Sequence, residues 1–85
     1  MRIELELFGA LRGLEPGDRI ALEVEGDRVS ELRQALVAHA ARQWPGIAPG
    51  LLARCAFATP AQVLRESEPL PEDGRMAVLP PVSGG

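Results

Sequence analysis

The stretch Arg2-Ile3-Glu4-Leu5-Glu6-Leu7 alternates charged and apolar residues. Successive side chains of a β-strand point to opposite faces, so this pattern predicts a strand with one buried face. Phe8 follows on the charged side, which turns its ring towards solvent. The segment from Ile20 to Val24 repeats the alternation, and Pro16-Gly17 between the two fits the centre of a tight turn. We therefore expect an antiparallel pair of strands at the amino end.

A helix is expected next. Its predicted apolar face has spacings of three and four residues, at Val29, Leu32, Leu36 and Ala40. Asp27 is placed to cap its first turn by accepting backbone N–H groups. Trp44-Pro45-Gly46 should end it, because a proline disfavours the helical state of the residue before it. We expect Trp44 to cover the end of the core.

The second half predicts shorter elements. Residues 46–53 form a connection with room for one helical turn, residues 54–58 a strand with Cys55 and Phe57 on one face, and residues 62–64 a short edge strand. Residues 76–79 are continuously apolar, as in a central strand. One helix across one face of a mixed sheet is an α+β arrangement. We expect a single domain over residues 1–79, followed by an extended tail over residues 80–85.

Composition excludes several classes of function. The chain has 85 residues and a net charge of −3 with no basic block, so we expect no nucleic-acid partner. No apolar run is long enough to span a membrane and no secretory signal is visible, so we expect a cytoplasmic protein without a membrane partner. Cys55 and His39 are single, which allows neither a disulfide nor a metal site. We interpret Cys55 as a small buried residue and His39 as a polar helix position; a Cys–His nucleophile pair is a weaker alternative.

The chemistry is expected at the carboxyl end, Leu79-Pro80-Pro81-Val82-Ser83-Gly84-Gly85. Two prolines end sheet pairing and favour an extended departure from the body. Two glycines have no Cβ to clash in a narrow channel. Such a tail suits a carboxylate that an adenylating enzyme activates, after which a sulfur donor displaces AMP and leaves a thiocarboxylate. The competing interpretation is a frayed tail, and two terminal glycines occur by chance in about 1% of such chains.

The ending from Pro80 to Gly85 resembles that of the small subunit of molybdopterin synthase, the MoaD-like sulfur carriers of the MoaD/ThiS ubiquitin-like family. The opening strand with Phe8, residues 29–34 and residues 71–74 also resemble that family, whereas residues 41–58 resemble it least. The resemblance implies a β-grasp, or ubiquitin-like, fold. It also implies that the chain is a carrier and no enzyme by itself, in agreement with the absence of an acid–base pair or phosphate loop from the sequence.

The resemblance further implies a set of partners. A ubiquitin-activating-type enzyme would use ATP to adenylate Gly85, with Gly84 beside it, so this chain itself would bind no cofactor and no metal. A cysteine desulfurase or rhodanese system would supply sulfur. The large synthase subunit would pass it to cyclic pyranopterin monophosphate, in a heterotetramer of two small and two large subunits.

Family contact positions match Phe8, Val63 and Leu79, as an apolar docking surface beside the tail residues Pro80, Pro81, Val82 and Ser83. Sheet packing is an equal alternative for Val63. The chain departs from the family pattern in having Val78-Leu79 where aromatic residues are common, and in its apolar residues 55–58. Both departures bear on the identity of the partner.

Three other functions stay open. The first is a carrier for thiamine thiazole or cysteine synthesis, which shares the diglycine ending. The second is a ubiquitin-like interaction module whose tail is never activated, and the third is a protein modifier attached through Gly85. All nine basic residues are arginines. The lack of lysine would limit acylation of the chain by its own activated carboxylate, although coding bias explains it more simply.

Overall fold

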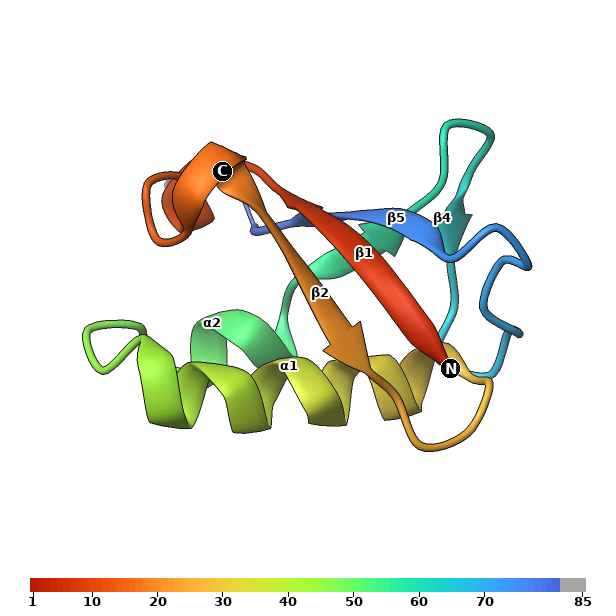
Figure 1. Ribbon diagram of the computed structural model, residues 1–85, viewed down its shortest axis with the longest axis horizontal. Helices are drawn as coiled ribbons and strands as arrows, with labels where there is room; N and C mark the ends of the chain where they lie inside the picture. Colours follow the sequence, from red (N-terminus) through yellow and green to blue (C-terminus); the bar gives the residue numbers. More distant parts are fainter. Residues whose placement is uncertain (82–85) are drawn as a thin grey trace.

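The computed structural model describes residues 1–81, in which a mixed sheet is crossed on one face by a helix (Figure 1). The strand order is β2-β1-β5-β3-β4. β1 (Arg2–Leu7) pairs antiparallel with β2 (Arg19–Glu23) and parallel with β5 (Arg75–Leu79). β3 (Ala56–Ala58) pairs antiparallel with β5 and with β4 (Val63–Leu64). The predicted α+β, β-grasp architecture is confirmed, with β5 as the central strand.

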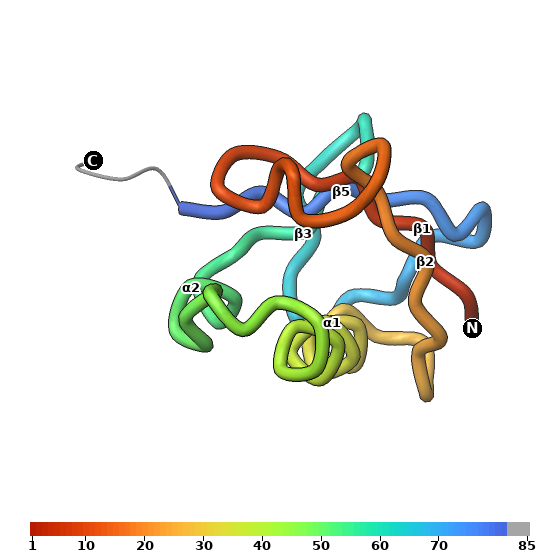
Figure 2. Tube along the Cα trace, turned by 60° about the vertical axis from the view of Figure 1, so that its left-hand side comes forward, coloured from red at the N-terminus to blue at the C-terminus, as the bar shows by residue number. Residues whose placement is uncertain are grey.

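The core lies between the sheet and α1 (Val29–Gln43), and Figure 2 shows these two layers from the side. The alternation in β1 has the predicted effect, because its apolar side chains are buried and its charged ones are exposed. The four residues at helical spacing on α1 are also buried. Together these side chains form the centre of the core: Ile3, Leu5, Leu7, Val29, Leu32, Leu36 and Ala40.

The prediction that Asp27 caps α1 is wrong. The carboxylate of Glu31 accepts the backbone N–H groups of Asp27 and Arg28, both at 3.1 Å. Oδ1 of Asp27 instead lies 3.5 Å from Nε of Arg28. The backbone carbonyl of Asp27 accepts the N–H of Leu70. The first N–H groups of α1, those of Val29 and Ser30, bond instead to the backbone carbonyls of Glu68 and Glu66, at 3.1 and 3.0 Å.

The second half of the chain differs from the prediction mainly at element ends. α2 (Pro49–Ala53) confirms the helical turn before β3. β3 begins at Ala56 instead of residue 54, because the N–H groups of Arg54 and Cys55 bond to the carbonyls of Leu51 and Leu52 at the end of α2. Cys55 and Phe57 are nevertheless both buried, as expected. β4 is the predicted edge strand, shortened by one residue.

The loop between β1 and β2 contains two short 3₁₀ turns, η1 (Gly9–Leu11) and η2 (Pro16–Asp18). In η2 the N–H of Asp18 bonds to the carbonyl of Glu15, and Gly17 has a φ of 70°, so the predicted turn at Pro16-Gly17 is confirmed. Leu11 in η1 is fully buried, which the local pattern did not indicate.

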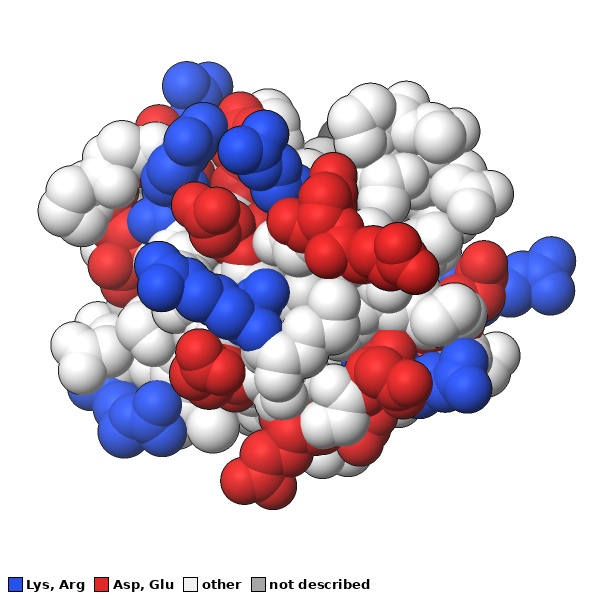
Figure 3. Space-filling model, turned by 45° about the vertical axis from the view of Figure 1, so that its right-hand side comes forward, with Lys and Arg blue, Asp and Glu red and all other residues white. Residues whose placement is uncertain are grey.

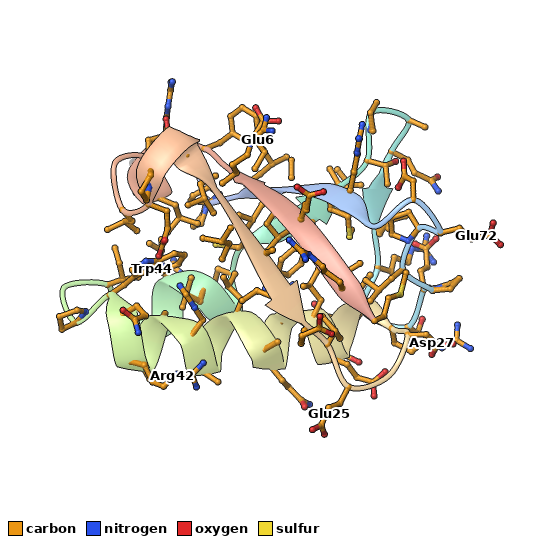
Figure 4. All side chains as sticks on the ribbon, viewed as in Figure 1. Glu6, Glu25, Asp27, Arg42, Trp44 and Glu72 are labelled. Carbon is orange, nitrogen blue, oxygen red and sulfur yellow. The ribbon has the colours of Figure 1, made fainter. Side chains whose placement is uncertain are left out.

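Trp44 closes one end of the core, as predicted, and is 3% exposed. It lies between the end of α1 and the loop that carries η1 and η2 (Figure 4). Its indole N–H donates to the carboxylate of Glu15 at 2.8 Å, and His39 Nε2 lies 3.0 Å from the same oxygen. These hydrogen bonds, first that from His39 and then that from Trp44, lower the pKa of Glu15. The cluster ties the β1–β2 loop to α1.

No helix in the described part of the chain is long and apolar enough to cross a membrane.

Candidate docking surface beside the tail

The outer face of the sheet, opposite α1, contains a half-buried apolar strip. Buried and outward-facing side chains alternate along β5 as they do along β1. Met76 and Val78 are buried in the core on the side of α1, whereas Ala77 and Leu79 face outwards and are half-buried. Ala58 of β3 lies opposite Ala77 in the register. The outward side chains at the centre of this sheet are therefore small or apolar, in contrast to the charged ones of β1 and β2.

An open groove of about 590 Å³ follows this strip. Its apolar lining consists of Phe8, Ala77, Leu79, Ala58 and Pro60, and Phe8 and Leu79 lie at the end where β1 and β5 finish. Charged side chains also line it: Glu4 lies opposite Arg75, and Glu6 lies opposite Arg19. The face shown in Figure 3 likewise has acidic and basic side chains interspersed, with no extended block of one sign.

Phe8 stands at the end of the groove where β1 and β5 finish. Leu7 pairs with Val78 in the parallel ladder, so one step further along both strands brings Phe8 beside Leu79. The backbone of Phe8 is extended, with φ −124° and ψ 166°, which continues the alternation of β1. Its ring is 37% exposed, so the predicted outward orientation is confirmed.

The residue after Phe8 lies close to the first residue of the tail. Gly9 has a φ of +57°, and a Cβ at this position would lie 3.5 Å from Cγ of Pro80. Because β1 and β5 run parallel, the residues that follow them leave the sheet side by side. No local pattern in the sequence connects Gly9 with Pro80, because their proximity depends on the parallel pairing of the two strands. Pro80 and Pro81 are both half-buried.

Val63 also lies on the outer face but apart from this cluster. It pairs with Ala58 at the far edge of the sheet, is 59% exposed, and does not line the groove. The structure thus brings Phe8, Leu79 and Pro80 together and leaves Val63 to one side. The other predicted tail residues, Val82, Ser83, Gly84 and Gly85, lie outside the described residues.

The alternative of a Cys–His nucleophile pair finds no support in the geometry. Cys55 is buried and its Sγ donates to the carbonyl of Leu51, while His39 is bonded to Glu15. Burial raises the pKa of the Cys55 thiol, an effect that Arg33 and Arg54 partly oppose. A nucleophilic thiol requires the opposite shift. Among residues 1–81, no three His, Cys, Asp or Glu side chains are grouped so that they could hold a metal ion.

The sheet and the helix across it define a β-grasp, ubiquitin-like protein whose final strand leads directly into its carboxyl-terminal segment. The chain belongs to the ThiS family, because the ThiS family model matches residues 5–85. This membership confirms a ubiquitin-like carrier of the ThiS/MoaD type.

Two solved structures are similar over the full length of both chains. SAMP1 from Haloferax volcanii has a TM-score of 0.67 and 26% sequence identity. A complex of subunits 1 and 2 of molybdopterin-converting factor from Helicobacter pylori contains a chain with a TM-score of 0.53 and 23% identity, and this likeness concerns the fold alone. No curated protein matches the sequence significantly.

Proposed function

We propose that this protein carries sulfur as a thiocarboxylate on Gly85 and donates it in molybdopterin synthesis, as the small subunit of a molybdopterin synthase. The chain would form an acyl-adenylate at Gly85, with ATP consumed by a ubiquitin-activating-type enzyme. A sulfur donor would then displace AMP. The acceptor is cyclic pyranopterin monophosphate, held by a large subunit that supplies the catalytic groups. The chain itself needs no bound cofactor for this role.

The observation that carries the proposal is the position of the tail's first residues. Pro80 follows the central strand β5 and lies close to Gly9, beside the exposed Phe8 and next to Leu79. A partner that takes residues 82–85 into its active site would therefore meet an apolar surface at the entrance. Exposed aromatic residues are common anchors of protein interfaces. The ThiS family match, which includes residues 82–85, supports the same carrier chemistry.

The docking surface would consist of Phe8, Leu79, Pro80 and Pro81, with Val82 and Ser83 in the channel. We assign Val63 a peripheral contact, since it lies at the edge of the sheet away from Phe8. The domain would then end at Leu79, with residues 80–85 acting as the arm. Because the reaction needs a cytoplasmic ATP supply and reduced sulfur, we place the protein in the cytoplasm.

Intact mass measures the first step. The protein is incubated with a MoaD-type adenylating enzyme, ATP and a sulfur donor; we expect a gain equal to replacement of one oxygen by sulfur. Deletion of Gly85 should abolish the gain, whereas Val37→Ala, an exposed change on α1, should leave it intact. An unchanged mass with an enzyme that is active on its own carrier would refute the thiocarboxylate. It would favour an interaction module whose tail is never activated.

A second test concerns the pathway. The molybdopterin proposal draws on the similarity to a molybdopterin-converting factor chain and on the Pro80-Pro81-Val82-Ser83 lead-in. A carrier for thiamine thiazole or cysteine synthesis is the second candidate, because the family match supports the chemistry of the whole ThiS family without selecting a pathway. Thiocarboxylated protein should co-purify with a large synthase subunit and convert cyclic pyranopterin monophosphate. Co-purification with a thiazole synthase instead would select the second candidate, and isopeptide-linked conjugates in extract would indicate a protein modifier.

A further inference from the structure

The outer edge of β2 is unpaired in the part of the chain that the structure describes. β2 stands first in the strand order, and β1 is its one neighbour within residues 1–81. Met1 and Val24 exchange backbone hydrogen bonds of 2.8 and 2.7 Å, so they are a hydrogen-bonded pair. In antiparallel strands, hydrogen-bonded and non-hydrogen-bonded pairs alternate, so the residues of β2 and its end that bond towards β1 are Ile20, Leu22 and Val24. The N–H and C=O groups of Arg19, Ala21 and Glu23 therefore point away from the sheet.

These three edge residues are self-complementary. Arg19 and Glu23 stand at equal distances along the strand from Ala21, and all three side chains are exposed. A second β2 laid antiparallel about Ala21 would place Ala21 opposite itself and Arg19 opposite Glu23. Each of these pairs would exchange both backbone hydrogen bonds, because all three residues have outward-facing groups. The two flanking pairs would also be of opposite charge.

The charges continue this pattern within each copy. Arg2 of β1 lies opposite Glu23, and Glu6 lies opposite Arg19. Across the joined edge, the outer face would present rows in which acid and base alternate, from Glu6 through Arg19 to Glu23 and Arg2 of the second copy. A twofold axis through Ala21 generates both rows at once, as closed symmetry requires.

There is also space for a second strand beside β2. An open groove of about 490 Å³ runs between β2 and α1. On the helix side its lining includes the small residues Ala35 and Ala38. Its large apolar lining residue, Leu22, belongs to β2 itself. We propose that β2 is a homodimerisation edge, at which two copies of this protein form one continuous sheet through antiparallel β2–β2 pairing.

This pairing is compatible with the proposed carrier role but independent of it. β1 stands between β2 and β5, so the apolar surface formed by Phe8, Leu79 and Pro80 is not part of the joined edge. Each dimer would therefore present two such surfaces. The dimer test below needs neither activation of Gly85 nor any partner protein.

Sedimentation velocity over micromolar to millimolar concentrations tests the pairing. The mean mass should rise from 9.1 kDa towards twice that value. Arg19→Glu and Glu23→Arg each place like charges opposite one another twice per dimer, so each should weaken association about tenfold or more. The double variant R19E/E23R should restore it. An equimolar mixture of the two single variants should also associate, because one chain is then acidic at both positions and the other basic.

Ala21→Pro provides a backbone control. The N–H that proline lacks points away from β1, so the monomer should keep its circular dichroism spectrum and unfolding midpoint while dimer formation is lost. A wild-type protein that stays monomeric up to millimolar concentration would overturn the proposal. β2 would then be a solvated edge protected by its charges, or an edge for a strand of another protein. A dimer that Ala21→Pro and both single variants leave unchanged would place the interface elsewhere and overturn it equally.

Discussion

The two faces of the sheet use the same strands in different ways. On the face towards α1, Leu5, Val78 and Phe57 are fully buried in the core. On the outer face, Leu79 and Ala77 of the same β5 are only half-buried and border an open groove with Phe8. Apolar residues that alternate along one strand thus divide between the core and an accessible surface, and the proposed function assigns the second group to partner binding.

The inner face should be the more sensitive to truncation. Leu5→Ala removes a fully buried side chain from the centre of β1 and leaves a cavity, so the free energy of unfolding should fall by about 2–5 kcal/mol. That is a large part of the stability expected for a domain of this size. Urea denaturation measures the change. A loss below about 1 kcal/mol would show that the core repacks and would remove the contrast between the two faces.

Glu15 should have an intermediate effect, because it closes one end of the inner layer. Glu15→Gln replaces a carboxylate that accepts hydrogen bonds from Trp44 and His39, and should cost about 1 kcal/mol at neutral pH. The pKa of Glu15 is lower in the folded chain than its ordinary value of 4.5. The stabilisation of the folded state by Glu15 is therefore complete above pH 4.5, and it is lost as the pH falls through the lower pKa of the folded chain.

Unfolding midpoints measured from pH 7 down to acid pH test this. The difference between wild type and Glu15→Gln should be constant above about pH 5 and shrink below the ordinary pKa of 4.5. A difference that grows as the pH falls would contradict the assignment of the charged carboxylate as the stabilising form.

The outer face should respond least in stability and most in binding. Phe8 and Val37 are exposed to the same extent, 37% and 36%, but Val37 lies on α1. Replacing either by alanine should change the free energy of unfolding by less than about 1 kcal/mol. Phe8→Ala should in addition weaken binding to the activating enzyme or the large subunit about tenfold, whereas Val37→Ala should not. Titration calorimetry with both variants decides; equal affinities would remove Phe8 from the docking surface.

Sequence patterns predicted the features that depend on local periodicity. The alternation in β1 and β2 and the spacing in α1 gave the burial of these elements, and the outward direction of Phe8 followed from β1. Features that depend on distant residues were not predicted. Glu15 bonds to side chains 24 and 29 residues away, and no local pattern connects them. The cap of α1 was misassigned because the backbone carbonyls of Glu66 and Glu68, more than 35 positions away in sequence, accept the N–H groups of Ser30 and Val29 in place of the Asp27 side chain.

The docking surface shows the same division. Each of Phe8, Leu79 and Pro80 could be selected from the sequence, but their proximity depends on the parallel register of β1 and β5. The pairing of β4 with β3 at the edge of the sheet places Val63, which the sequence grouped with them, to one side. Long-range strand pairing thus decides which predicted residues form one surface.

The parallel pairing of β1 with β5 has a consequence for how the protein is made. Glu4 and its partner Arg75 are 71 positions apart in sequence, so the centre of the sheet depends on a contact of high sequence separation. Such contacts form slowly, because a long loop must close before they contribute. On the ribosome, β1 and β2 can pair early, but β1 and β3 lack their shared neighbour until β5 has emerged. Chains cut short before β5 would therefore remain unfolded and open to proteolysis, and only chains that extend past β5 would display a folded surface to a partner.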